Sequence, residues 1–429
     1  MRTAEQVVNE INSARGDGDE QGLRNTAALL ELLRAWPECP VIHVAGTNGK
    51  GSVCAMLSSV LTAAGYSIGL YTSPFLQTYA ERVRINGTPV SEAQLARYGS
   101  DVLNATDRLH TEKGYSFVPF ELGTALAFHA FRQEKTEIIV SETGLGGRLD
   151  PTNVIPKPAV CAITAIGMDH MQLLGDTLAA IAGEKAGIIK SGVPAVCYPP
   201  ETAEVRQVFE KTAAAKGAPL NVLDPGQIRI RESGPCGTTA DLICGSRTWS
   251  GVKISLPGAH QVLNALVVLA VLGELEKQGI RIPEEAVYRG LANTFWPGRL
   301  EWHGRILMDG AHNAQGVRAF TAFTDTSLQG KKKILLTGVL KEKLSDEMLS
   351  MLAGAADEAV TVTPDSPRAM KAEDLCALLR EKGMKASAAN NLKEGLRKAE
   401  GLAGEDGIIL ATGSLYFIGA LRSALELKP

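Results

Sequence analysis

The sequence lacks the features that mark secreted, membrane-spanning or zinc-stabilised proteins. Its 7 cysteines are scattered and none forms a CxxC pair. Neither a disulfide framework nor a zinc ribbon is therefore expected, and the thiols are predicted to be reduced and buried. No uninterrupted apolar run reaches the roughly 18 residues of a membrane span, and the N-terminal segment is charged, without the apolar core of a signal peptide. These absences predict a cytoplasmic protein.

The charge is nearly balanced, with 44 basic and 47 acidic residues and a formal net charge of −3. The longest basic run, at 331–333, contains only lysines and is short. A protein that binds nucleic acid or an anionic membrane usually carries a much larger basic patch. The sequence therefore predicts small-molecule partners, with no nucleic acid and no membrane.

What the sequence has in abundance is glycine, with 44 residues, many of them directly after short β-branched runs. Examples are VIHVAG (41–46), IIVSETG (138–144) and ILLTG (334–338). Strands that end in glycine turns indicate ligand loops at their carboxyl ends. Between these runs, apolar residues recur with helical spacing. This alternation predicts an α/β fold with a mostly parallel sheet covered by helices.

The 429 residues are enough for two or three domains. Proline and glycine interrupt regular structure in Asn293–Arg299, which predicts a boundary between domains 1–296 and 297–429. The second, smaller domain is expected to be α/β and Rossmann-like, and residues 223–256 to form an antiparallel excursion. Helices are expected at 51–64, 91–111, 121–132, 177–190, 261–278, 283–293, 313–325, 345–356, 372–382, 392–401 and 415–426.

A glycine-rich loop with one lysine follows the first strand, in VIHVAGTNGKGS (41–52). Glycines let backbone amides approach phosphates, a following helix adds partial positive charge, and Lys50 can neutralise the β/γ oxygens. Ser52 can then face a magnesium ion. The common P-loop places Ser or Thr directly after the lysine, whereas here Gly51 intervenes. On this segment alone, a glycine turn with an incidental lysine stays open.

Polar residues lie at the ends of three further predicted strands. Ser73 follows 68–72, Glu142 ends 137–141, and Asp169 and His170 follow 159–167. A hydroxyl, a carboxylate and an imidazole that converge beside a triphosphate suit a divalent ion bridging phosphate oxygens. Alone, each is equally consistent with a structural role.

Two further side chains have both a structural and a chemical interpretation. Arg148, after two glycines, offers a donor fork suited to a carboxylate or phosphate, or belongs to a structural glycine loop. Lys185 lies in an otherwise apolar helix, where a lysine usually extends to the surface. Alternatively, an amine with a depressed pKa can react with carbon dioxide and become an anionic metal ligand.

Taken together, these segments resemble the folylpolyglutamate synthase/dihydrofolate synthase family, within the Mur-type ATP-dependent amide ligases. The resemblance covers nearly the whole chain, and the order and spacing of the motifs are highly specific. The motifs are AGTNGKGS (45–52), YTSPFL (71–76), ERVRING (81–87), PFE (119–121), ETGLGGRLDPTN (142–153), MDHMQLLGDT (168–177), IAGEKAGIIKSG (181–192), LPGAHQVLNA (256–265), WPGRLE (296–301), DGAHN (309–313) and GSLYFIG (413–419).

The resemblance implies an ATP site and two magnesium ions. The matching phosphate loop is Thr47, Asn48, Gly49, Lys50, Gly51 and Ser52, and the nucleotide is also held by Asn264, Arg299 and Asp309, the last two from the linker and second domain. The matching magnesium ligands are Ser73, Glu142 and His170, with a carbamylated Lys185 holding the second ion. Lys50, His170 and Lys185 are implied to be catalytic.

The resemblance also assigns the substrate segments. Val118, Pro119, Phe120, Glu121, Leu149, Asp150 and Pro151 match the family's pterin contacts, with Arg148 beside them, and His312 is implied to line the interdomain cleft where glutamate binds. The family often has histidine where this chain has Phe75, which removes a donor near the pterin and bears on the choice of folate. A monomer is the family's default.

The expected activity is ATP-dependent addition of L-glutamate to dihydropteroate, to the γ-carboxylate of a folate, or to both, through an acyl phosphate. A cell-wall Mur ligase, acting on a different carboxylate, is less expected because only 45 residues precede Gly46. A switch GTPase is disfavoured because no Asn-Lys-x-Asp sequence occurs. An inactive nucleotide-binding homologue could have lost its metal ligands, yet all four are present.

Overall fold

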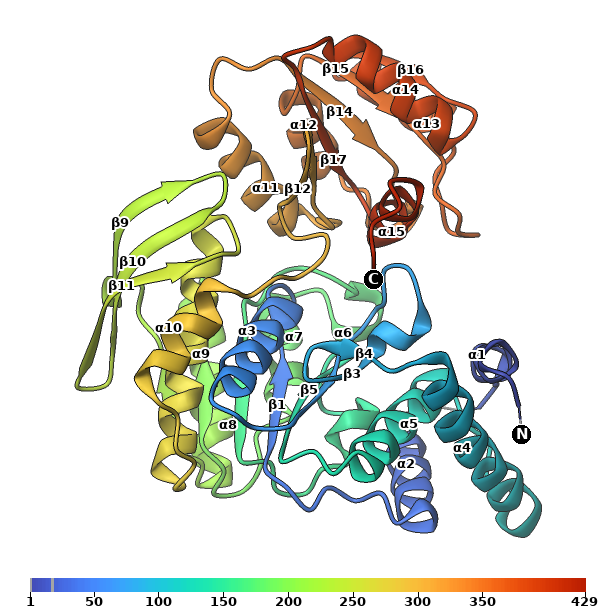
Figure 1. Cartoon of the computed structure of the whole chain (residues 1–429), viewed down its shortest axis with the longest axis vertical. Helices are drawn as coiled ribbons and strands as arrows, with labels where there is room; N and C mark the ends of the chain where they lie inside the picture. The colour runs from blue at the N-terminus through green and yellow to red at the C-terminus, as the bar shows by residue number, and fades with distance from the viewer. Residues whose placement is uncertain (1, 17–18) are drawn as a thin grey trace. The chain divides into compact units, whose positions relative to one another are not determined.

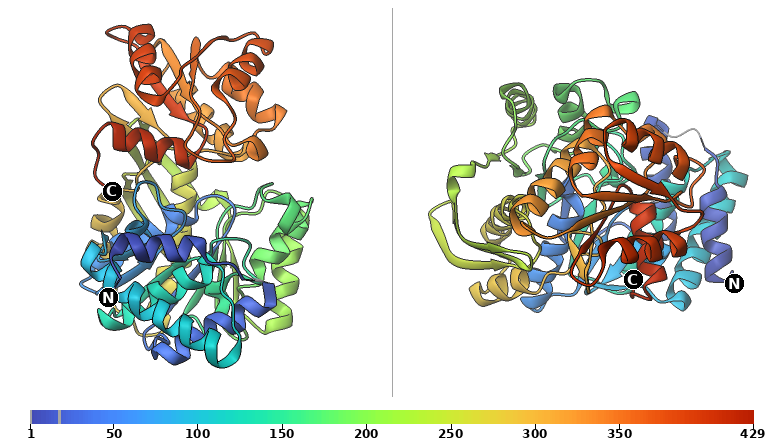
Figure 2. Two further views of the ribbon diagram at one scale, coloured as in Figure 1. Left: turned by 90° about the vertical axis from the view of Figure 1, so that its right-hand side faces the viewer. Right: turned by 90° about the horizontal axis from the view of Figure 1, so that it is seen from above.

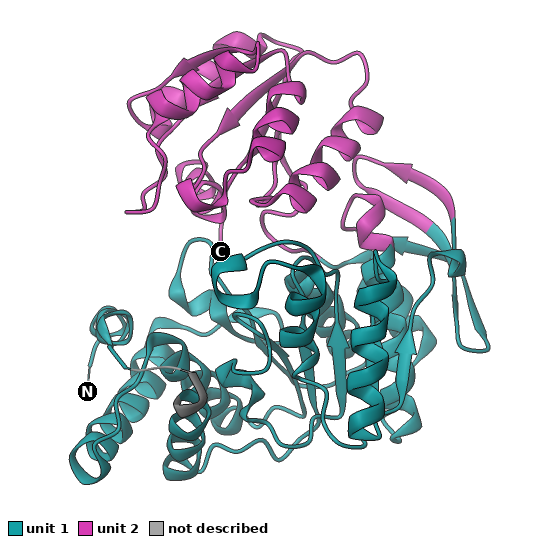
Figure 3. Ribbon diagram, turned by 180° about the vertical axis from the view of Figure 1, so that it is seen from behind, with its two compact units in different colours: residues 1–229, 240–254, 263–294 teal, residues 230–239, 255–262, 295–429 magenta. Residues whose placement is uncertain are grey.

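The computed structural model describes residues 2–16 and 19–429 and separates into two compact units. Unit 1 comprises residues 1–229, 240–254 and 263–294, and unit 2 comprises 230–239, 255–262 and 295–429 (Figure 3). The main change of unit thus falls between residues 294 and 295, and two short segments that precede it group with unit 2.

Unit 1 contains an eight-stranded sheet of order β4-β3-β2-β5-β1-β6-β7-β8. Its strands are β1 (Val41–Ala45), β2 (Ile68–Tyr71), β3 (Val83–Ile85), β4 (Thr88–Pro89), β5 (Ile138–Glu142), β6 (Val160–Ile163), β7 (Ala195–Cys197) and β8 (Leu220–Val222). All neighbouring pairs in the order β2-β5-β1-β6-β7-β8 are parallel, whereas β3 is antiparallel to both of its neighbours, β2 and β4. The carboxyl ends of β1, β2, β5 and β6 therefore meet at one edge.

The helices of this part of the chain cover the sheet (Figure 1). They are α1 (Ala4–Ser13), α2 (Asp19–Leu33), α3 (Lys50–Ala63), α4 (Glu92–Lys113), α5 (Pro119–Gln133), α6 (Met171–Leu174), α7 (Leu178–Ala186), α8 (Ala203–Lys216), α9 (Ala259–Lys277) and α10 (Glu284–Ala292). Every residue of β1 and β5 is buried, as parallel strands covered on both faces require.

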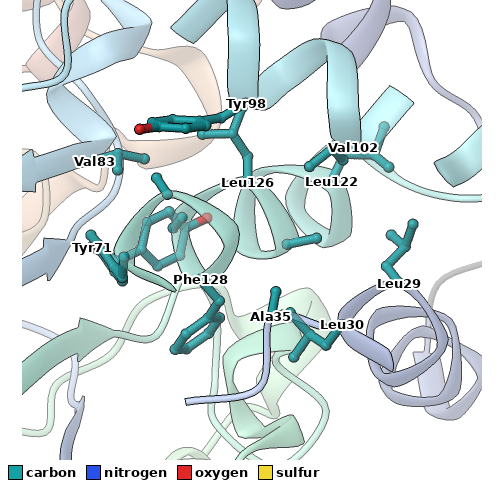
Figure 4. Packing of buried hydrophobic residues seen from close by; sticks show 14 of the residues in the cluster. Leu29, Leu30, Ala35, Tyr71, Val83, Tyr98, Val102, Leu122, Leu126 and Phe128 are labelled. Carbon is teal, nitrogen blue, oxygen red and sulfur yellow. The ribbon is translucent and has the colours of Figure 1, made fainter. Parts of the chain in front are cut away.

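Two apolar clusters anchor these helices to the sheet. One cluster joins α1, α2, α4 and α5 to β2 and β5. Figure 4 shows some of its members, among them Leu29 and Leu30 of α2, Val102 of α4 and Leu126 of α5. The other joins α7 and α8 to β6 and β7 through residues such as Phe209. Burying these side chains supplies the main driving force for folding.

Residues 228–254 form a separate three-stranded sheet of order β11-β10-β9. Its strands are β9 (Ile228–Gly234), β10 (Gly237–Cys244) and β11 (Arg247–Ile254). Two residues connect each strand to the next, and such short connections join only antiparallel strands. The antiparallel excursion expected at 223–256 is therefore confirmed.

Unit 2 contains a six-stranded sheet of order β12-β13-β17-β14-β15-β16, in which only β12 is antiparallel. The strands are β12 (Glu301–His303), β13 (Ile306–Met308), β14 (Lys333–Thr337), β15 (Glu358–Thr361), β16 (Lys385–Ala388) and β17 (Ile408–Thr412). The helices are α11 (Ala314–Ser327), α12 (Asp346–Gly354), α13 (Ala372–Glu381), α14 (Leu392–Ala403) and α15 (Leu415–Ala424).

Alternate residues of these strands enter two different cores. Leu335 packs with α11, α12 and α13, whereas its neighbours Ile334 and Leu336 pack with α14 and α15. This period of two places helices on both faces of the sheet (Figure 2). The α/β fold with a parallel-rich sheet and a second α/β domain is thus confirmed.

Several local expectations needed correction. The helix expected at 177–190 ends at Ala186, and helices α1, α2 and α8 and strand β16 were not predicted. In α8 only Val205, Phe209 and Ala213 are buried, among many alanine and charged residues, so its apolar pattern is weak. The cysteines are free, but Cys236 is exposed and two others are only partly buried, so uniform burial was wrong.

One described helix, α9, is long and apolar enough to pass a length and composition test for a membrane span. Its most apolar window is 67% buried inside the protein, however. Consecutive residues from Ala265 to Leu272 are buried. The apolar surface of α9 is therefore largely used by the protein's own core.

Candidate functional site

The loop between β1 and α3 adopts a conformation that its glycines make possible. Gly46 has a φ of 149°, and a Cβ there would lie 1.8 Å from Thr164 Oγ1. Gly49 has a φ of 90°, and a Cβ there would lie 2.7 Å from Asn264 Oδ1. The structure thus places Asn264 directly against the predicted phosphate loop. Among the described residues, no side chain caps α3 at Gly49, and an uncapped helix start of this kind is suited to an anion.

The segment after β6 fixes the position of this loop. The amides of Thr47 and Asn48 donate to the Ala165 carbonyl at 2.8 and 3.2 Å. The Thr47 hydroxyl donates to the Gly167 carbonyl at 3.0 Å, and the same oxygen lies 3.1 Å from the Gly167 amide. Hydrogen bonds to the segment after β6 therefore fix the backbone geometry of the loop without a ligand.

Two lysine ammonium groups point at one carbonyl in this loop. Lys50 Nζ donates to the carbonyls of Gly46 and Thr47 at 3.0 and 3.2 Å, and Lys185 Nζ donates to Gly46 at 2.8 Å. Lys185 is only 4% exposed, so its interpretation as a surface-reaching side chain is wrong. Burial, and then the nearby Lys50 cation, lower the pKa of Lys185 to about 7.

A carboxylate lies beside Lys50. Glu142, the buried last residue of β5, accepts a hydrogen bond from the Ser73 amide at 3.1 Å. Its other oxygen lies 4.0 Å from Lys50 Nζ. The strand ends of β1, β2 and β5 thus bring together Lys50, Ser73 and Glu142. The sequence predicted a set of Ser73, Glu142 and His170, of which these contacts join the first two.

His170 takes a different position from the other proposed magnesium ligands. It has a left-handed backbone, with a φ of 50°, and its side chain is 42% exposed. Its backbone amide donates to Asp169 Oδ1 at 2.8 Å, and its Nε2 lies 3.9 Å from the same oxygen. The structure therefore leaves this imidazole accessible while burying Glu142 and Lys185.

The donor set suits magnesium in its usual protein setting. Within residues 2–16 and 19–429, no group of three or more His, Cys, Asp and Glu side chains is assembled that could hold a metal by itself. Magnesium, however, is commonly held by one or two carboxylates together with substrate phosphates and water. The buried carboxylate of Glu142 beside Lys50 and the glycine loop fits that arrangement.

The proposed pterin segments form the start of α5 and the loop after β5. Phe120 packs against the loop, because a Cβ on Gly144 would lie 2.2 Å from Phe120 Cζ. Glu121 is buried, accepts from the Val118 amide at 3.0 Å, and has its pKa raised by burial to about 7. It therefore acts first as the cap of α5, following Pro119 at the helix start.

The Asp150 carboxylate is occupied by its own loop. Oδ2 accepts from the amides of Gly144 and Leu145, both at 2.8 Å, and Oδ1 accepts from the Thr152 amide and hydroxyl at 3.0 and 2.5 Å. Arg148 is exposed and pairs with Glu184 at 3.1 Å. Leu149 and Pro151 flank Asp150, so this carboxylate shapes the segment that presents them.

Phe75 belongs to a group of aromatic rings around one cation. The Arg82 guanidinium lies 5.4 Å from the Phe75 ring, 5.3 Å from the Tyr79 ring and 6.0 Å from the Phe120 ring. Phe75 and Tyr79 are also in contact, with centroids 5.8 Å apart. The residue that departs from the family's usual histidine is thus joined to Phe120 through Arg82.

Three predicted residues lie in unit 2 and are close to one another. Asp309 is buried and accepts from the amides of Leu300 and Ala311 at 2.9 and 2.8 Å. Burial raises the pKa of Asp309, and the Arg299 charge opposes this shift. Arg299 donates to the Gly298 carbonyl at 3.1 Å, and His312 Nδ1 lies 2.8 Å from the Gly310 carbonyl.

Sequence reasoning did not single out some groups that shape these sites. Thr164 and Ala165 hold the phosphate loop. Arg82 lies in the quoted ERVRING motif, but nothing in its spacing indicated three aromatic neighbours. Asp169 was noted beside His170 at a strand end, but its effect in favouring the charged form of Lys185 was not predicted.

Comparisons with known proteins identify Mur ligase domains along most of the chain. The model of the Mur ligase middle domain matches residues 44–272, and that of the Mur ligase glutamate ligase domain matches residues 298–415. The chain is 36% identical over 418 residues to the dihydrofolate synthase/folylpolyglutamate synthase of Bacillus subtilis (strain 168). That alignment covers 95% of this chain and 96% of the relative.

Solved structures agree with this result. The folylpolyglutamate synthase of Mycobacterium tuberculosis, complexed with ADP, superposes with a TM-score of 0.91 at 30% identity and covers 99% of both chains. Escherichia coli FolC in complex with DHPP and ADP gives a TM-score of 0.86 at 27% identity, over 99% of this chain and 98% of that one. The likeness therefore extends over both units.

Proposed function

We infer the activity of this chain from its family, because it belongs to the dihydrofolate synthase/folylpolyglutamate synthase family of Mur ligases. It is an ATP-dependent acid–amino-acid ligase that adds L-glutamate to a pteroate or folate carboxylate. The observation that carries this conclusion is the juxtaposition of the glycine loop, Lys50, Glu142 and Lys185 at one sheet edge.

The reaction needs ATP because a carboxylate is a poor electrophile at neutral pH. In the first step, a carboxylate oxygen of the acceptor attacks the γ-phosphorus of ATP in line, and the bond to the β-phosphate oxygen breaks. This gives an acyl phosphate and ADP. The amine of glutamate then attacks the acyl carbon, inorganic phosphate leaves, and the amide nitrogen loses a proton. Water must be excluded meanwhile, because acyl phosphates hydrolyse readily.

The phosphate loop is proposed to hold the triphosphate. The residues involved are Thr47, Asn48, Gly49, Lys50, Gly51 and Ser52. Lys50 neutralises charge on the transferring oxygens, and the uncapped start of α3 supplies backbone donors. Asn264 supports this loop at Gly49. In unit 2, Arg299 and Asp309 are proposed to bind the same nucleotide.

Two magnesium ions are proposed as cofactors. Ser73, Glu142 and His170 would hold one, and Lys185, as a carbamate, would hold the other. When bound, magnesium neutralises the charge that develops on the phosphoryl oxygens. Carbamate formation requires a neutral amine that attacks carbon dioxide and releases one proton. The pKa of Lys185, about 7, supports a large neutral fraction at physiological pH.

The remaining predicted residues are assigned to the other substrates. The segment from Val118 to Glu121 and the loop from Arg148 to Pro151 are proposed to bind the pterin end of the acceptor, and His312 the incoming glutamate. The names of the relatives support both acceptors, since one is a dihydrofolate synthase/folylpolyglutamate synthase and another was solved with DHPP. We propose a bifunctional enzyme that acts as a cytoplasmic monomer.

The test is phosphate release from ATP with magnesium and L-glutamate. Dihydropteroate, tetrahydrofolate and no acceptor are compared, and product masses are checked for each added glutamate. Turnover with both acceptors is expected. Turnover with one would assign a single activity, and no turnover with either would contradict the proposed function in favour of a different carboxylate or an inactive homologue.

A Phe75→His variant sharpens this test. It restores the ring donor that the family often has, at a position beside Arg82. If Phe75 sets acceptor choice, the ratio of kcat/KM for dihydropteroate and tetrahydrofolate changes while ATP binding does not. An unchanged ratio would remove Phe75 from the specificity argument.

A further inference from the structure

We propose that the buried ion pair between Glu301 and Arg422 is a positioning device for Arg299, through which helix α15 takes part in nucleotide binding. The idea rests on the proposed role of Arg299 and Asp309 in holding ATP. Arg422 lies in the last helix of unit 2 and Glu301 is the first residue of β12. Neither residue has been assigned a role above.

The burial of this pair is unusual for charged residues. The side chains of Arg422 and Glu301 are 2% and 7% exposed, and Arg422 Nη1 donates to Glu301 Oε1. Removing two charges from water is costly, and such pairs are often no more stabilising than apolar residues of similar size. A role in fixing one backbone conformation explains the pair better than stability alone.

The conformation to be fixed is the turn that carries Arg299. The second oxygen of Glu301 accepts from the Gly298 amide at 2.8 Å. Gly298 has a φ of 67° and Leu300 a φ of 46°, so left-handed residues flank Arg299 on both sides. A branched residue such as leucine adopts this region only when its surroundings hold it there. The Glu301 carboxylate therefore connects helix α15 to a turn that needs support.

The same turn connects directly to both proposed nucleotide residues. The Gly298 carbonyl accepts from Arg299 Nη1 at 3.1 Å and from the Gly310 amide at 2.8 Å. The Leu300 amide donates to Asp309 Oδ2 at 2.9 Å. A Cβ on Gly310 would lie 2.5 Å from Arg299 Nη1. A shift of the turn must therefore move Arg299 and Asp309 together.

Arg422 is itself held from the other side. Its Nη2 donates to the Lys428 carbonyl, and the Leu427 amide donates to the Arg422 carbonyl at 3.0 Å. The guanidinium thus bridges the chain after α15 and the Glu301 carboxylate. Its fork of donors serves both acceptors at once, which the single ammonium of a lysine does less well.

The experiment combines Arg422→Met with Arg299→Ala and measures ADP affinity by calorimetry on the full chain. If Arg422 acts through the Arg299 turn, Arg422→Met weakens ADP binding about tenfold in the native background and has a clearly smaller effect in the Arg299→Ala background, where only Asp309 remains to be displaced. Arg422→Lys is expected to recover part of the affinity. Equal losses in both backgrounds would overturn the proposal.

A matched control separates positioning from general destabilisation. Leu379→Ala removes a buried side chain from the core under α11, α12 and α13, and is expected to lower the Tm without changing ADP affinity. If Arg422→Met behaves in the same way, its role is structural and the proposal fails. Should Arg422→Met not fold, Glu301→Gln replaces it, because glutamine keeps an acceptor for Gly298 while removing the charge.

Amide exchange gives a readout that does not depend on the nucleotide assignment. Faster exchange at Gly298 and Leu300 in Arg422→Met, with unchanged exchange in α13, is expected if the pair holds the turn. If Arg299→Ala leaves ADP affinity unchanged, the nucleotide role proposed for Arg299 fails. Unchanged exchange at these two amides would instead refute the positioning device itself.

Discussion

The loops that follow β1 in unit 1 and β13 in unit 2 make the same type of connection but use their polar groups differently. Each connects a buried parallel strand to a helix. The loop after β1 places Gly49 at the start of α3 with no capping side chain. The loop after β13 ends at Asn313, which caps α11 through the Gly316 amide at 2.8 Å. The start of α3 thus has no side-chain cap from its N-cap residue, whereas the start of α11 is capped by Asn313.

The difference continues along the two loops. After β1, two lysines converge on the Gly46 carbonyl, and the Glu142 carboxylate lies beside one of them, Lys50. After β13, the Asp309 carboxylate accepts from two backbone amides of its own unit. The first loop thus presents backbone and cations to a ligand. In the loop after β13, the Asp309 carboxylate fixes the backbone through the amides of Leu300 and Ala311. This backbone carries His312 and is bonded to the turn that carries Arg299.

The largest expected effect comes from Lys50→Ala in the first loop. Removing the cation that is proposed to face the triphosphate should lower kcat by about 10²–10³-fold, if it stabilises charge that develops in phosphoryl transfer. Phosphate release at saturating ATP measures this. Lys157→Ala, at an exposed lysine of the same unit, serves as the control. A loss of less than threefold in Lys50→Ala would contradict the charge role of this loop.

Lys185→Ala should lower turnover by about 10–100-fold, the usual range when a metal site loses a supporting group. Added acetate should restore part of it, since a small acid can occupy the place of the carbamate. Lys185→Arg is the matched control, because it keeps a cation and cannot react with carbon dioxide. Full activity in Lys185→Ala would remove the carbamate from the proposal.

The pH dependence of the native enzyme tests the same lysine. With a folded pKa of about 7, Lys185 is mostly neutral above pH 7 and mostly protonated below it. Only the neutral amine reacts with carbon dioxide, so activity is expected to fall as the pH drops below about 7. Acetate-rescued Lys185→Ala should lack this acid limb. Identical pH profiles would show that another group titrates.

Arg299→Ala should act on ATP binding and spare folding. We expect the KM for ATP to rise about tenfold, the range of one lost charge-assisted hydrogen bond, with Tm unchanged within a degree or so. Arg305→Ala is the control, because this arginine donates to the Gly404 and Gly407 carbonyls of the same unit outside the Arg299 turn. An equal rise in KM for both variants would count against a specific role.

The smallest effect is expected from Asn313→Ala, which removes the cap of α11. The free energy of unfolding should fall by about 1 kcal/mol, while the KM for ATP stays the same. Asn391→Ala removes the comparable cap of α14, whose oxygen accepts from the Glu394 amide at 2.9 Å. If Asn313→Ala alone raised the KM for ATP, the loop after β13 would bind nucleotide through its backbone as well.

Much of the fold could be predicted because its pattern is local. Apolar runs that end in glycine correctly indicated β1, β5 and β14, and helical spacing indicated α3, α4 and α5 within a few residues. The strand ends then placed Ser73 and Glu142 together, because parallel strands finish at one edge. The antiparallel strands β9 to β11 followed from alternation of polar and apolar residues in the same way.

The residues that sequence reasoning missed or left open depend on distant contacts. Lys185 had two interpretations, and only the packing of α7 beside the Gly46 carbonyl, 139 positions away, decided between a surface and a buried amine. The ion pair of Glu301 and Arg422 spans 121 positions, and the Phe120 ring reaches Arg82 from α5, a distant segment of the chain. Contacts between such distant residues leave no periodic pattern in the local sequence.

By itself, then, the sequence determined the α/β class, the glycine loop and the chemical types gathered at the strand ends. These depend on backbone preferences and on spacing along one element, which neighbouring residues set. Only the tertiary structure decided the strand order, the burial and lowered pKa of Lys185, and the support of the Arg299 turn by helix α15. Those properties arise when segments far apart in the chain pack together and exclude water. Burial then shifts the pKa of a charged group and makes it depend on the few partners that packing places beside it.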